Sequence, residues 1–303
     1  MLNPISLTVP FYAYHRTRIF SKIYDQEFGE TNLDNQDFVS FQRDPKPRVV
    51  SYCAPISETY RFFQGRDNQK IRRDMMVISF FSAFYDSIFD EDYNPSSQDF
   101  AGRLIGGEHP NPTTDLERVI AFSFQKLEES IGRDKKGLYD CLKRIHGLQI
   151  EGLGQRREQY DDMDVRNREE YLRNITFQKG SCSFLTYSFV SNPELNDESL
   201  TRDIEEIGSY LQVFDDMLDV YKDSRDGNVT LLTEGMIGEV EAIQRAERAF
   251  NLLNDRFYPT FSKQIVIQAL RIMHREGMDK VRRFRQGLLE PNNRVHKIAL
   301  LFK

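Results

Sequence analysis

Four aspartates fall within nine positions of one short segment in the C-terminal half of the chain, where LQVFDDMLDVYKDSRDG at residues 211–227 includes Asp215, Asp216, Asp219 and Asp223. Asp215, Asp219 and Asp223 recur at four-residue steps, so a helical rotation of about 100° per residue places them along one stripe. Like charges one turn apart destabilise an isolated helix, so a positive partner is expected among them. Carboxylate oxygens suit Mg²⁺, which commonly joins one or two carboxylates to phosphate groups. The segment therefore predicts a magnesium site that holds a diphosphate.

A second acidic pair lies upstream in the segment SAFYDSIFDEDY, where Asp86 and Asp90 have the same four-residue spacing. The small residues Ser79, Ser82 and Ala83 occupy neighbouring turns of that face. A helix face that packs into a core normally carries bulky apolar side chains. The small residues therefore predict the wall of a cavity beside the two carboxylates.

Either acidic cluster alone is most often explained as the solvated face of a surface helix. Both clusters, however, follow strongly apolar helical segments and stand at their C-terminal ends, where the helix macrodipole opposes negative charge. Apolar residues directly precede the carboxylates, as Val213 and Phe214 precede Asp215. Taken together, the two clusters favour a metal-lined pocket over two solvated faces.

The overall composition is that of a globular protein. Of 303 residues, 39% are hydrophobic and 29% are charged, and no apolar run reaches the roughly 18 residues of a membrane span. The formal net charge of -6 argues against a general nucleic-acid binder. Cys53, Cys141 and Cys182 are odd in number and fit no paired metal pattern, and no export signal is recognised. A cytoplasmic protein with reduced thiols, no nucleic-acid partner and no stable membrane insertion is expected.

Apolar residues recur at three- and four-residue steps along most of the chain, whereas alternating strand patterns are absent. The periodicity predicts helices over residues 71–90, 114–131, 136–160, 167–190, 199–223, 237–254 and 260–288. No linker, repeat or low-complexity tract divides the sequence. We therefore expect a single all-α domain over residues 1–303, with about ten or more helices around a central cavity and a less regular segment at 1–66.

These motifs resemble those of the class I isoprenoid synthases, which comprise terpene cyclases, trans-prenyl diphosphate synthases and squalene/phytoene synthases. The segment DSIFD at 86–90 resembles their first aspartate-rich motif, DDxxD, with Ser87 in place of the second aspartate. QVFDDMLDV at 212–220 is similar to the second motif of the trans-prenyl diphosphate synthases, QxxDDxLDV. Asp223 and Gly227 extend it with the spacing of squalene/phytoene synthases, and positions 215, 219 and 223 overlay the metal-ligand triad of terpene cyclases.

The resemblance implies a class I terpenoid synthase fold, a prenyl diphosphate substrate and three Mg²⁺ ions bound with the diphosphate. It also implies ionisation of the substrate to a carbocation with release of pyrophosphate, and a possible homodimer. The metal ligands that it implies are Asp86, Asp90, Asp215, Asp219 and Asp223.

Two basic residues are candidates for stabilising the leaving diphosphate. Lys179 in the segment QKGS resembles a lysine that prenyl diphosphate synthases place before small residues, and Gly154-Gln155 resembles their GQ pair. Arg173 with Thr176 resembles a terpene cyclase segment whose arginine senses the diphosphate. Either cation would neutralise charge as it develops on the leaving group. The alternative for each is an ordinary helix-surface cation.

Further residues are assigned to substrate or phosphate by their place next to the motifs. The predicted substrate-binding residues are Phe80, Phe84, Phe177, Gly180, Ser181, Gln212 and Phe214. Aromatic faces among them are suited to stabilising a cation, and plain core packing is the alternative. A C-terminal basic group is either a phosphate contact or a solvated face, and it consists of Arg282, Arg283, Arg285, Arg294 and Lys297.

The choice of reaction depends on whether a second diphosphate is bound. Chain-elongating synthases bind isopentenyl diphosphate through a GGKRxRP-like segment, whereas residues 44–48 keep one lysine and one arginine without the glycines. This departure and Ser87 favour cyclisation of a single substrate. The alternatives are a prenyltransferase that joins two prenyl units, by chain elongation or head-to-head condensation, and a noncatalytic partner subunit. A di-iron bundle would need Glu-x-x-His pairs, and the sequence contains none.

Overall fold

The computed structural model describes residues 18–26, 69–90, 95–132, 136–192, 195, 197–256 and 261–288. Within these ranges the regular structure is helical, and the only extended pairing is an isolated antiparallel bridge between Arg156 and Asn228. The expected all-α class is therefore confirmed for this part of the chain. None of the helices described is long and apolar enough to cross a membrane.

Several predicted features fall outside the described residues. They are most of the segment 1–66, including 44–48 and Cys53, together with Arg294 and Lys297. Within 1–66 the structure describes one helical stretch, residues 18–26, on which Phe20 and Tyr24 are buried. Within the described residues, Cys141 and Cys182 are buried and are not joined by a disulfide.

The chain divides into two compact units. Unit 1 comprises residues 1–143, 187–194 and 296–303, and unit 2 comprises residues 144–186 and 195–295. Two helices, α6 (Lys136–Glu151) and α8 (Val165–Ser191), contribute residues to both units. The single domain over residues 1–303 stays a prediction.

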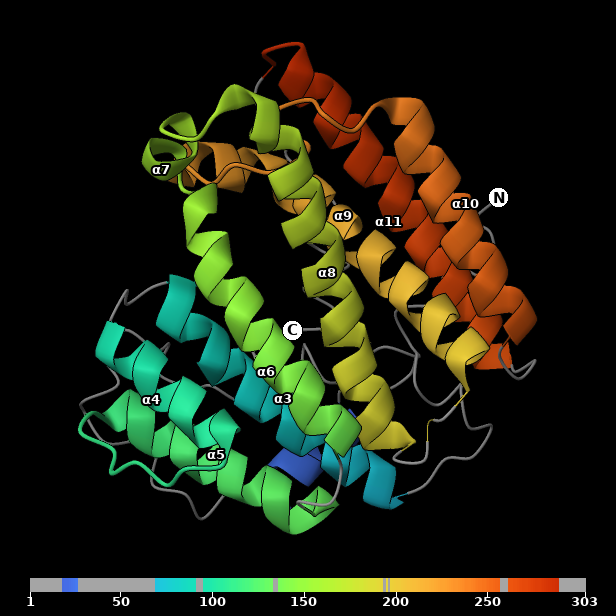
Figure 1. The fold of residues 1–303 in the computed structure, drawn as a ribbon. Helices are drawn as coiled ribbons and strands as arrows, with labels where there is room; N and C mark the ends of the chain where they lie inside the picture. The colour runs from blue at the N-terminus through green and yellow to red at the C-terminus, as the bar shows by residue number, and fades with distance from the viewer. Residues whose placement is uncertain are drawn as a thin grey trace. The chain divides into compact units, whose positions relative to one another are not determined.

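Unit 1 is built on α3 (Gln69–Asp90), α4 (Pro95–Gly106) and α5 (Asp115–Ile131), which pack against one another in pairs (Figure 1). Aromatic rings of α3 fill its core. The rings of Phe80 and Phe84 lie 4.7 Å apart, and Phe81 reaches Phe124 of α5 at 5.7 Å between ring centroids. Helix α4 was not among the predicted helices, because its 12 residues repeat the apolar period too few times to be distinguished from a loop.

A buried carboxylate organises the start of α5. Glu117 is 1% exposed, and its two oxygens accept hydrogen bonds from the Ser97 hydroxyl of α4 and from both the amide and the hydroxyl of Thr113, at 2.6–2.9 Å. Thr114 completes a capping box with Glu117. Burial alone would raise the pKa of Glu117, but the hydrogen bonds from Thr113, Ser97 and Thr114 together hold it below its usual value.

Replacing Glu117 with Ala should lower the free energy of unfolding by at least about 2 kcal/mol, because several buried donors lose their acceptor. Urea denaturation at pH 7 measures the loss. The folded pKa lies below the unfolded one, so the carboxylate stabilises the fold above the unfolded pKa, and this part of the stability disappears as the pH falls through the folded pKa. Glu129→Ala on the same helix is the control, since that side chain is 52% exposed and should change stability by less than about 1 kcal/mol.

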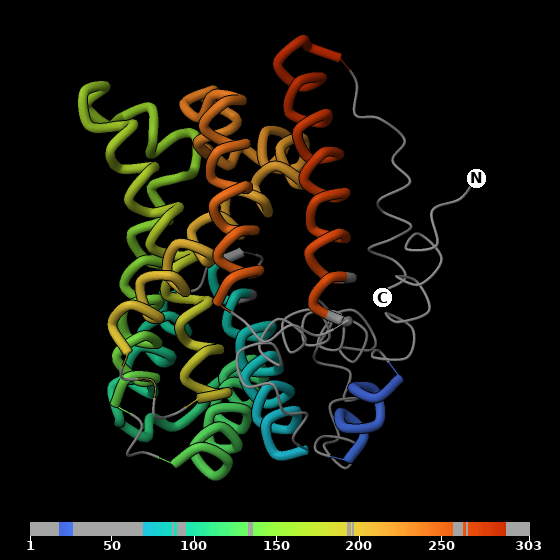
Figure 2. Tube along the Cα trace, turned by 90° about the vertical axis from the view of Figure 1, so that its right-hand side faces the viewer, coloured from blue at the N-terminus to red at the C-terminus, as the bar shows by residue number. Residues whose placement is uncertain are grey.

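Unit 2 contains most of α8 together with α9 (Glu198–Asp226), α10 (Glu239–Arg256) and α11 (Phe261–Arg285). Helix α10 runs antiparallel to α11, and α9 packs against both (Figures 1 and 2). Their shared core also receives side chains from the loop after α9. It includes Val213, Met217, Val220, Leu231, Leu232, Ala242, Met278 and Val281. The helices predicted at 199–223, 237–254 and 260–288 are thereby confirmed, with ends that differ by a few residues.

The prediction of one continuous helix over 136–160 is wrong. Helix α6 ends at Glu151 and is followed by a short 3-10 turn, η1 (Gly152–Gln155), and by α7 (Arg157–Asp161). Glycines at 152 and 154 weaken the helix, and Arg156 between the two turns is extended, at φ -69 and ψ 135. The backbone of this segment bonds instead to the loop after α9, where Val229 donates to the Gln155 carbonyl at 2.7 Å.

Helices α8 and α9 meet backbone to backbone at two glycines. A Cβ atom added to Gly180 would lie 2.2 Å from the carbonyl oxygen of Gly208, and one added to Gly208 would lie 2.4 Å from that of Gly180. One position further along α8, the Ser181 hydroxyl donates to the carbonyl of Glu205 at 2.8 Å. This crossing fixes which residues of α9 face α8.

Gly208→Ala should destabilise unit 2 by about 2–3 kcal/mol or more, because the new methyl group meets a backbone carbonyl that cannot rotate away. Guanidinium denaturation measures the change. The matched control is Gly147→Ala in α6, where an added Cβ meets nothing within 4 Å. That variant should be stabilised by about 0.5–1 kcal/mol, since alanine is the better helix former. Equal effects at both positions would contradict the close crossing.

Candidate diphosphate and metal site

The C-terminal half of α9 carries the predicted carboxylate stripe. Asp215 is exposed, whereas Asp219 and Asp223 are half-buried. By helical rotation, these residues continue the face that Gly208 and Gln212 present to α8. The close crossing at Gly208 therefore places the stripe on the side of α9 nearest α8.

Asp216 belongs to the same acidic face, although the sequence did not assign it as a ligand. Its side chain is 8% exposed and accepts a hydrogen bond from the Gln212 amide at 3.1 Å. Burial raises the pKa of Asp216 to about 8, and the charges of Asp215 and Asp223 act in the same direction. The Gln212 hydrogen bond and the positive charge of Lys179 only partly offset this rise. Burial and the neighbouring carboxylates therefore disfavour the charged form of Asp216.

Asp223 stands in the last turn of α9, and its pKa is raised as well. Burial raises its pKa to about 7, and Asp219 and Asp215 raise it further, against Lys222 and a hydrogen bond from the Asn228 side chain. The helix ends at Gly227, whose left-handed conformation (φ 76) lets the Asn228 amide return to the Asp223 carbonyl at 2.8 Å. The glycine that the sequence placed after the last aspartate is therefore a helix C-cap.

Lys179 supplies positive charge to this face from α8. Its ammonium donates to the side-chain oxygen of Gln155 in η1 at 3.3 Å, and its charge lowers the pKa of Asp216. Gln155 is itself fixed, because its amide nitrogen donates to the Val229 carbonyl at 3.1 Å. The predicted Lys179 and the Gly154-Gln155 pair are therefore brought together beside the acidic face of α9.

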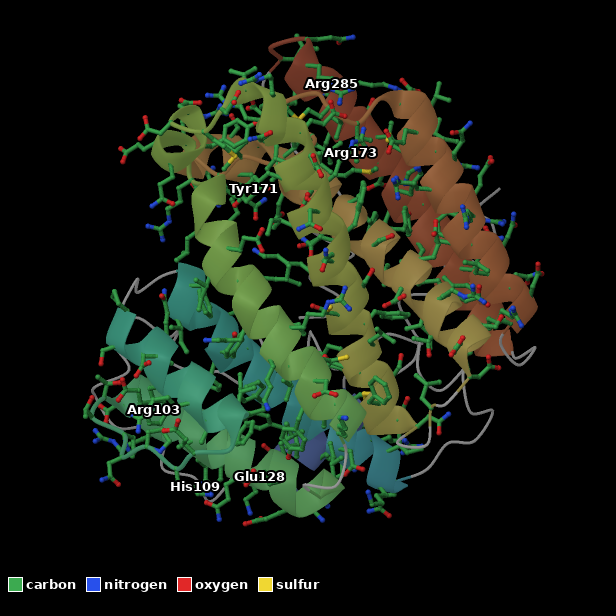
Figure 3. The ribbon with its side chains drawn as sticks, viewed as in Figure 1. Arg103, His109, Glu128, Tyr171, Arg173 and Arg285 are labelled. Carbon is green, nitrogen blue, oxygen red and sulfur yellow. The ribbon has the colours of Figure 1, made fainter. Side chains whose placement is uncertain are left out.

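Arg173, the other predicted diphosphate contact, has different partners. Its guanidinium forms a two-pronged ion pair with Glu241 of α10, at 2.8 and 3.2 Å, and a further hydrogen bond to Glu169 at 2.8 Å. These two carboxylates, with Glu241 the stronger, raise its pKa. Figure 3 shows where Arg173 projects from α8. Through the ion pair with Glu241, Arg173 connects α8 to the start of α10.

The predicted substrate-binding residues divide between the acidic face and the helix cores. Gln212 lies on the acidic face, and Gly180 and Ser181 form the α8–α9 crossing. Phe214 points elsewhere on α9 and stacks on Tyr210 in the core, at 6.1 Å between ring centroids. The remaining three are Phe177, which lies 4.0 Å from the guanidinium of Arg245, and Phe80 and Phe84, which are buried in unit 1.

The first acidic cluster belongs to unit 1, at the end of α3. Asp86 is half-buried, and Asp90 is the last residue of the helix, with a side chain outside the described part. On the same face Ser79 and Ala83 are buried and Ser82 is half-buried. The pairing of this cluster with the α9 carboxylates across the two units stays a prediction.

Part of the predicted basic group at the C-terminus stabilises the loop between α9 and α10. Arg282 pairs with Glu239 at 3.1 Å, and Arg285, labelled in Figure 3, donates to the Ile237 carbonyl at 2.6 Å. Both arginines therefore have protein partners, and neither of these partners belongs to the carboxylate stripe.

The donors on α9 are suitable for Mg²⁺, being carboxylate oxygens whose negative charge is only partly neutralised. Within the described ranges, however, no three His, Cys, Asp or Glu side chains are grouped closely enough to hold a metal ion alone. This is compatible with the way proteins bind Mg²⁺, through one or two carboxylates with waters and substrate phosphates completing the shell. Asn228 and Gly152 also belong to this region, although neither was predicted from the sequence as a site residue.

Comparison with known proteins gives no family assignment. No protein-family model matches the chain, and neither the curated proteins nor the solved structures include a match.

Replacing Asp216 with Asn should stabilise the metal-free protein more at pH 8.5 than at pH 4.5, by at least about 2 kcal/mol. The folded protein holds the Asp216 proton up to about pH 8, whereas the unfolded chain releases it near pH 4. Stability is therefore lost as the pH rises between these values, and the neutral amide removes that loss. Urea denaturation in EDTA at the two pH values tests this. Asp162→Asn, at an exposed position, should show no such difference.

Proposed function

We propose that the protein is a magnesium-dependent class I terpene synthase, which ionises a linear prenyl diphosphate and cyclises or rearranges the carbocation with release of pyrophosphate. One observation carries the proposal. Carboxylates line one face of α9, where burial and mutual repulsion raise the pKa of Asp216 and Asp223, and the ammonium of Lys179 acts on the same face. Perturbed carboxylates of this kind are typical of functional sites.

Each residue of the α9 face has a role in the proposal. In this proposal Asp215, Asp219 and Asp223 bind the metal, while Asp86 and Asp90 remain metal ligands predicted from the sequence. Bound Mg²⁺ would stabilise the charge that develops on the leaving diphosphate. Gln212 orients the buried carboxylate of Asp216 through its amide.

Lys179 is favoured over Arg173 as the cation that contacts the diphosphate. The guanidinium of Arg173 pairs with Glu241 and Glu169, away from the acidic face of α9, whereas the charge of Lys179 acts on Asp216 of that face. A fixed positive group beside the leaving group lowers the barrier most when it needs no rearrangement.

The apolar part of the substrate needs protection from water. Aromatic side chains on the predicted list are candidates for facing a carbocation, because their ring faces carry negative charge density. A homodimer, which the family resemblance implies, and a cytoplasmic location, which is expected from the sequence, stay predictions.

The test is incubation of the purified protein with Mg²⁺ and geranyl, farnesyl or geranylgeranyl diphosphate, with and without isopentenyl diphosphate. Pyrophosphate release and extracted products are measured. We expect a hydrocarbon or alcohol from one diphosphate alone. Asp219→Ala should lower kcat/KM by at least about 100-fold, since it removes a ligand that acts on the developing charge.

Asp226→Ala is the matched control. Asp226 is an exposed aspartate at the end of the same helix, paired with Arg225, and its loss should change kcat/KM less than about twofold. If a longer prenyl diphosphate forms, and only when isopentenyl diphosphate is present, the result would contradict the cyclase and indicate a prenyltransferase. Absence of pyrophosphate release with every substrate would favour the noncatalytic partner subunit.

A further inference from the structure

The ammonium of Lys179 occupies a place that two neighbouring residues have shaped. Gly152 provides the space, because a Cβ atom added there would lie 2.2 Å from the ammonium nitrogen and 2.8 Å from the adjoining carbon. Gln155 provides the acceptor, with its side-chain oxygen 3.3 Å from the same nitrogen. Both residues come from η1, at a point where the predicted helix is interrupted.

The acceptor cannot turn freely. The amide nitrogen of Gln155 donates to the Val229 carbonyl at 3.1 Å, and the Gln155 carbonyl accepts from the Val229 amide at 2.7 Å. Two residues further, the Arg157 amide donates to the Gly227 carbonyl at 2.8 Å. These hydrogen bonds therefore hold the segment that binds the ammonium against the residues directly after the end of α9.

The other side of the segment is fixed to α8. The hydroxyl of Tyr171 donates to the Glu151 carbonyl at 2.6 Å, and a Cβ atom on Gly154 would lie 2.7 Å from that hydroxyl. Lysine side chains lose considerable freedom when they are held in one conformation. A set of bonds that fixes both the acceptor and its backbone indicates that the position of this charge matters.

We propose that Gly152 and Gln155 are positioning residues, which hold the Lys179 ammonium at the acidic face of α9 so that it contacts the diphosphate. The inference rests on the proposed function for the identity of the anion, while the placement of Lys179 rests on geometry alone. Gln155 acts by its oxygen and Gly152 by the absence of a side chain, so each can be changed without altering Lys179 itself.

The experiment combines two measurements on the full chain. The first is the side-chain NH₃⁺ signal of Lys179 in ¹⁵N-lysine-labelled protein, assigned by its loss in Lys179→Arg. The second is calorimetric binding of inorganic pyrophosphate in excess Mg²⁺. Gln155→Met and Gly152→Ala should both shift the Lys179 signal and weaken pyrophosphate binding about tenfold, the loss expected for one charge-assisted contact.

A double variant distinguishes the positioning of Lys179 from a general effect on the structure. Lys179→Ala should weaken pyrophosphate binding to a similar extent, and adding Gln155→Met to it should cost nothing further. Gln159→Met on α7, which is exposed, and Gly147→Ala, where a Cβ meets nothing within 4 Å, are the matched controls and should leave both readouts unchanged.

The outcomes distinguish this inference from the proposed function. Additive losses in the double variant, or an unchanged Lys179 signal in Gln155→Met and Gly152→Ala, would overturn the positioning role even in an active terpene synthase. A shifted signal in a protein whose wild type binds no pyrophosphate would overturn the proposed function and keep the placement of Lys179 by Gly152 and Gln155.

Discussion

The contact between Gly180 and Gly208 is the constraint on which the carboxylate face depends. Neither position has room for a Cβ atom, so the two backbones touch, and a shift along either helix would bring a larger side chain into the crossing. Successive residues of a helix rotate by about 100°. The register fixed at the two glycines therefore also determines which later residues of α9 face α8. Gln212 follows one turn after Gly208, and Asp216 follows one turn after Gln212.

Burial and nearby charges determine how readily the carboxylates on that face ionise. Asp223 lies in the last turn of α9, where the macrodipole disfavours negative charge, and Asp216 is removed from water. Gln212 and Asn228 donate hydrogen bonds to these carboxylates, and Lys179 and Lys222 add positive charge, but burial has the larger effect and raises both pKa values. The charged form of Asp216 and Asp223 is therefore costly in the metal-free protein.

Much of the helical arrangement was predictable from the sequence, since long helices repeat their apolar period many times. Helices α3, α5, α8, α9, α10 and α11 were predicted within a few residues. Short or interrupted elements were not. Helix α4 has too few turns for the pattern to emerge, and the end of α6 at Glu151 depends on bonds between Gln155 and Val229, 74 residues apart. The carboxylate spacing predicted the stripe of Asp215, Asp219 and Asp223, but spacing carries no information on the burial of Asp216.

The sequence by itself determined the all-helical class of the described residues and the alignment of three carboxylates along one helix. Both follow from a rotation that is the same in every α-helix. Only the tertiary structure placed the charge of Lys179, and not that of Arg173, near Asp216 on the acidic face. Arg173 and Lys179 stand on one helix with the same charge, yet Arg173 meets Glu241, 68 residues away, whereas Lys179 meets Gln155, 24 residues away. A flexible cation takes the partner that the fold brings within hydrogen-bonding distance, and local sequence does not specify that partner.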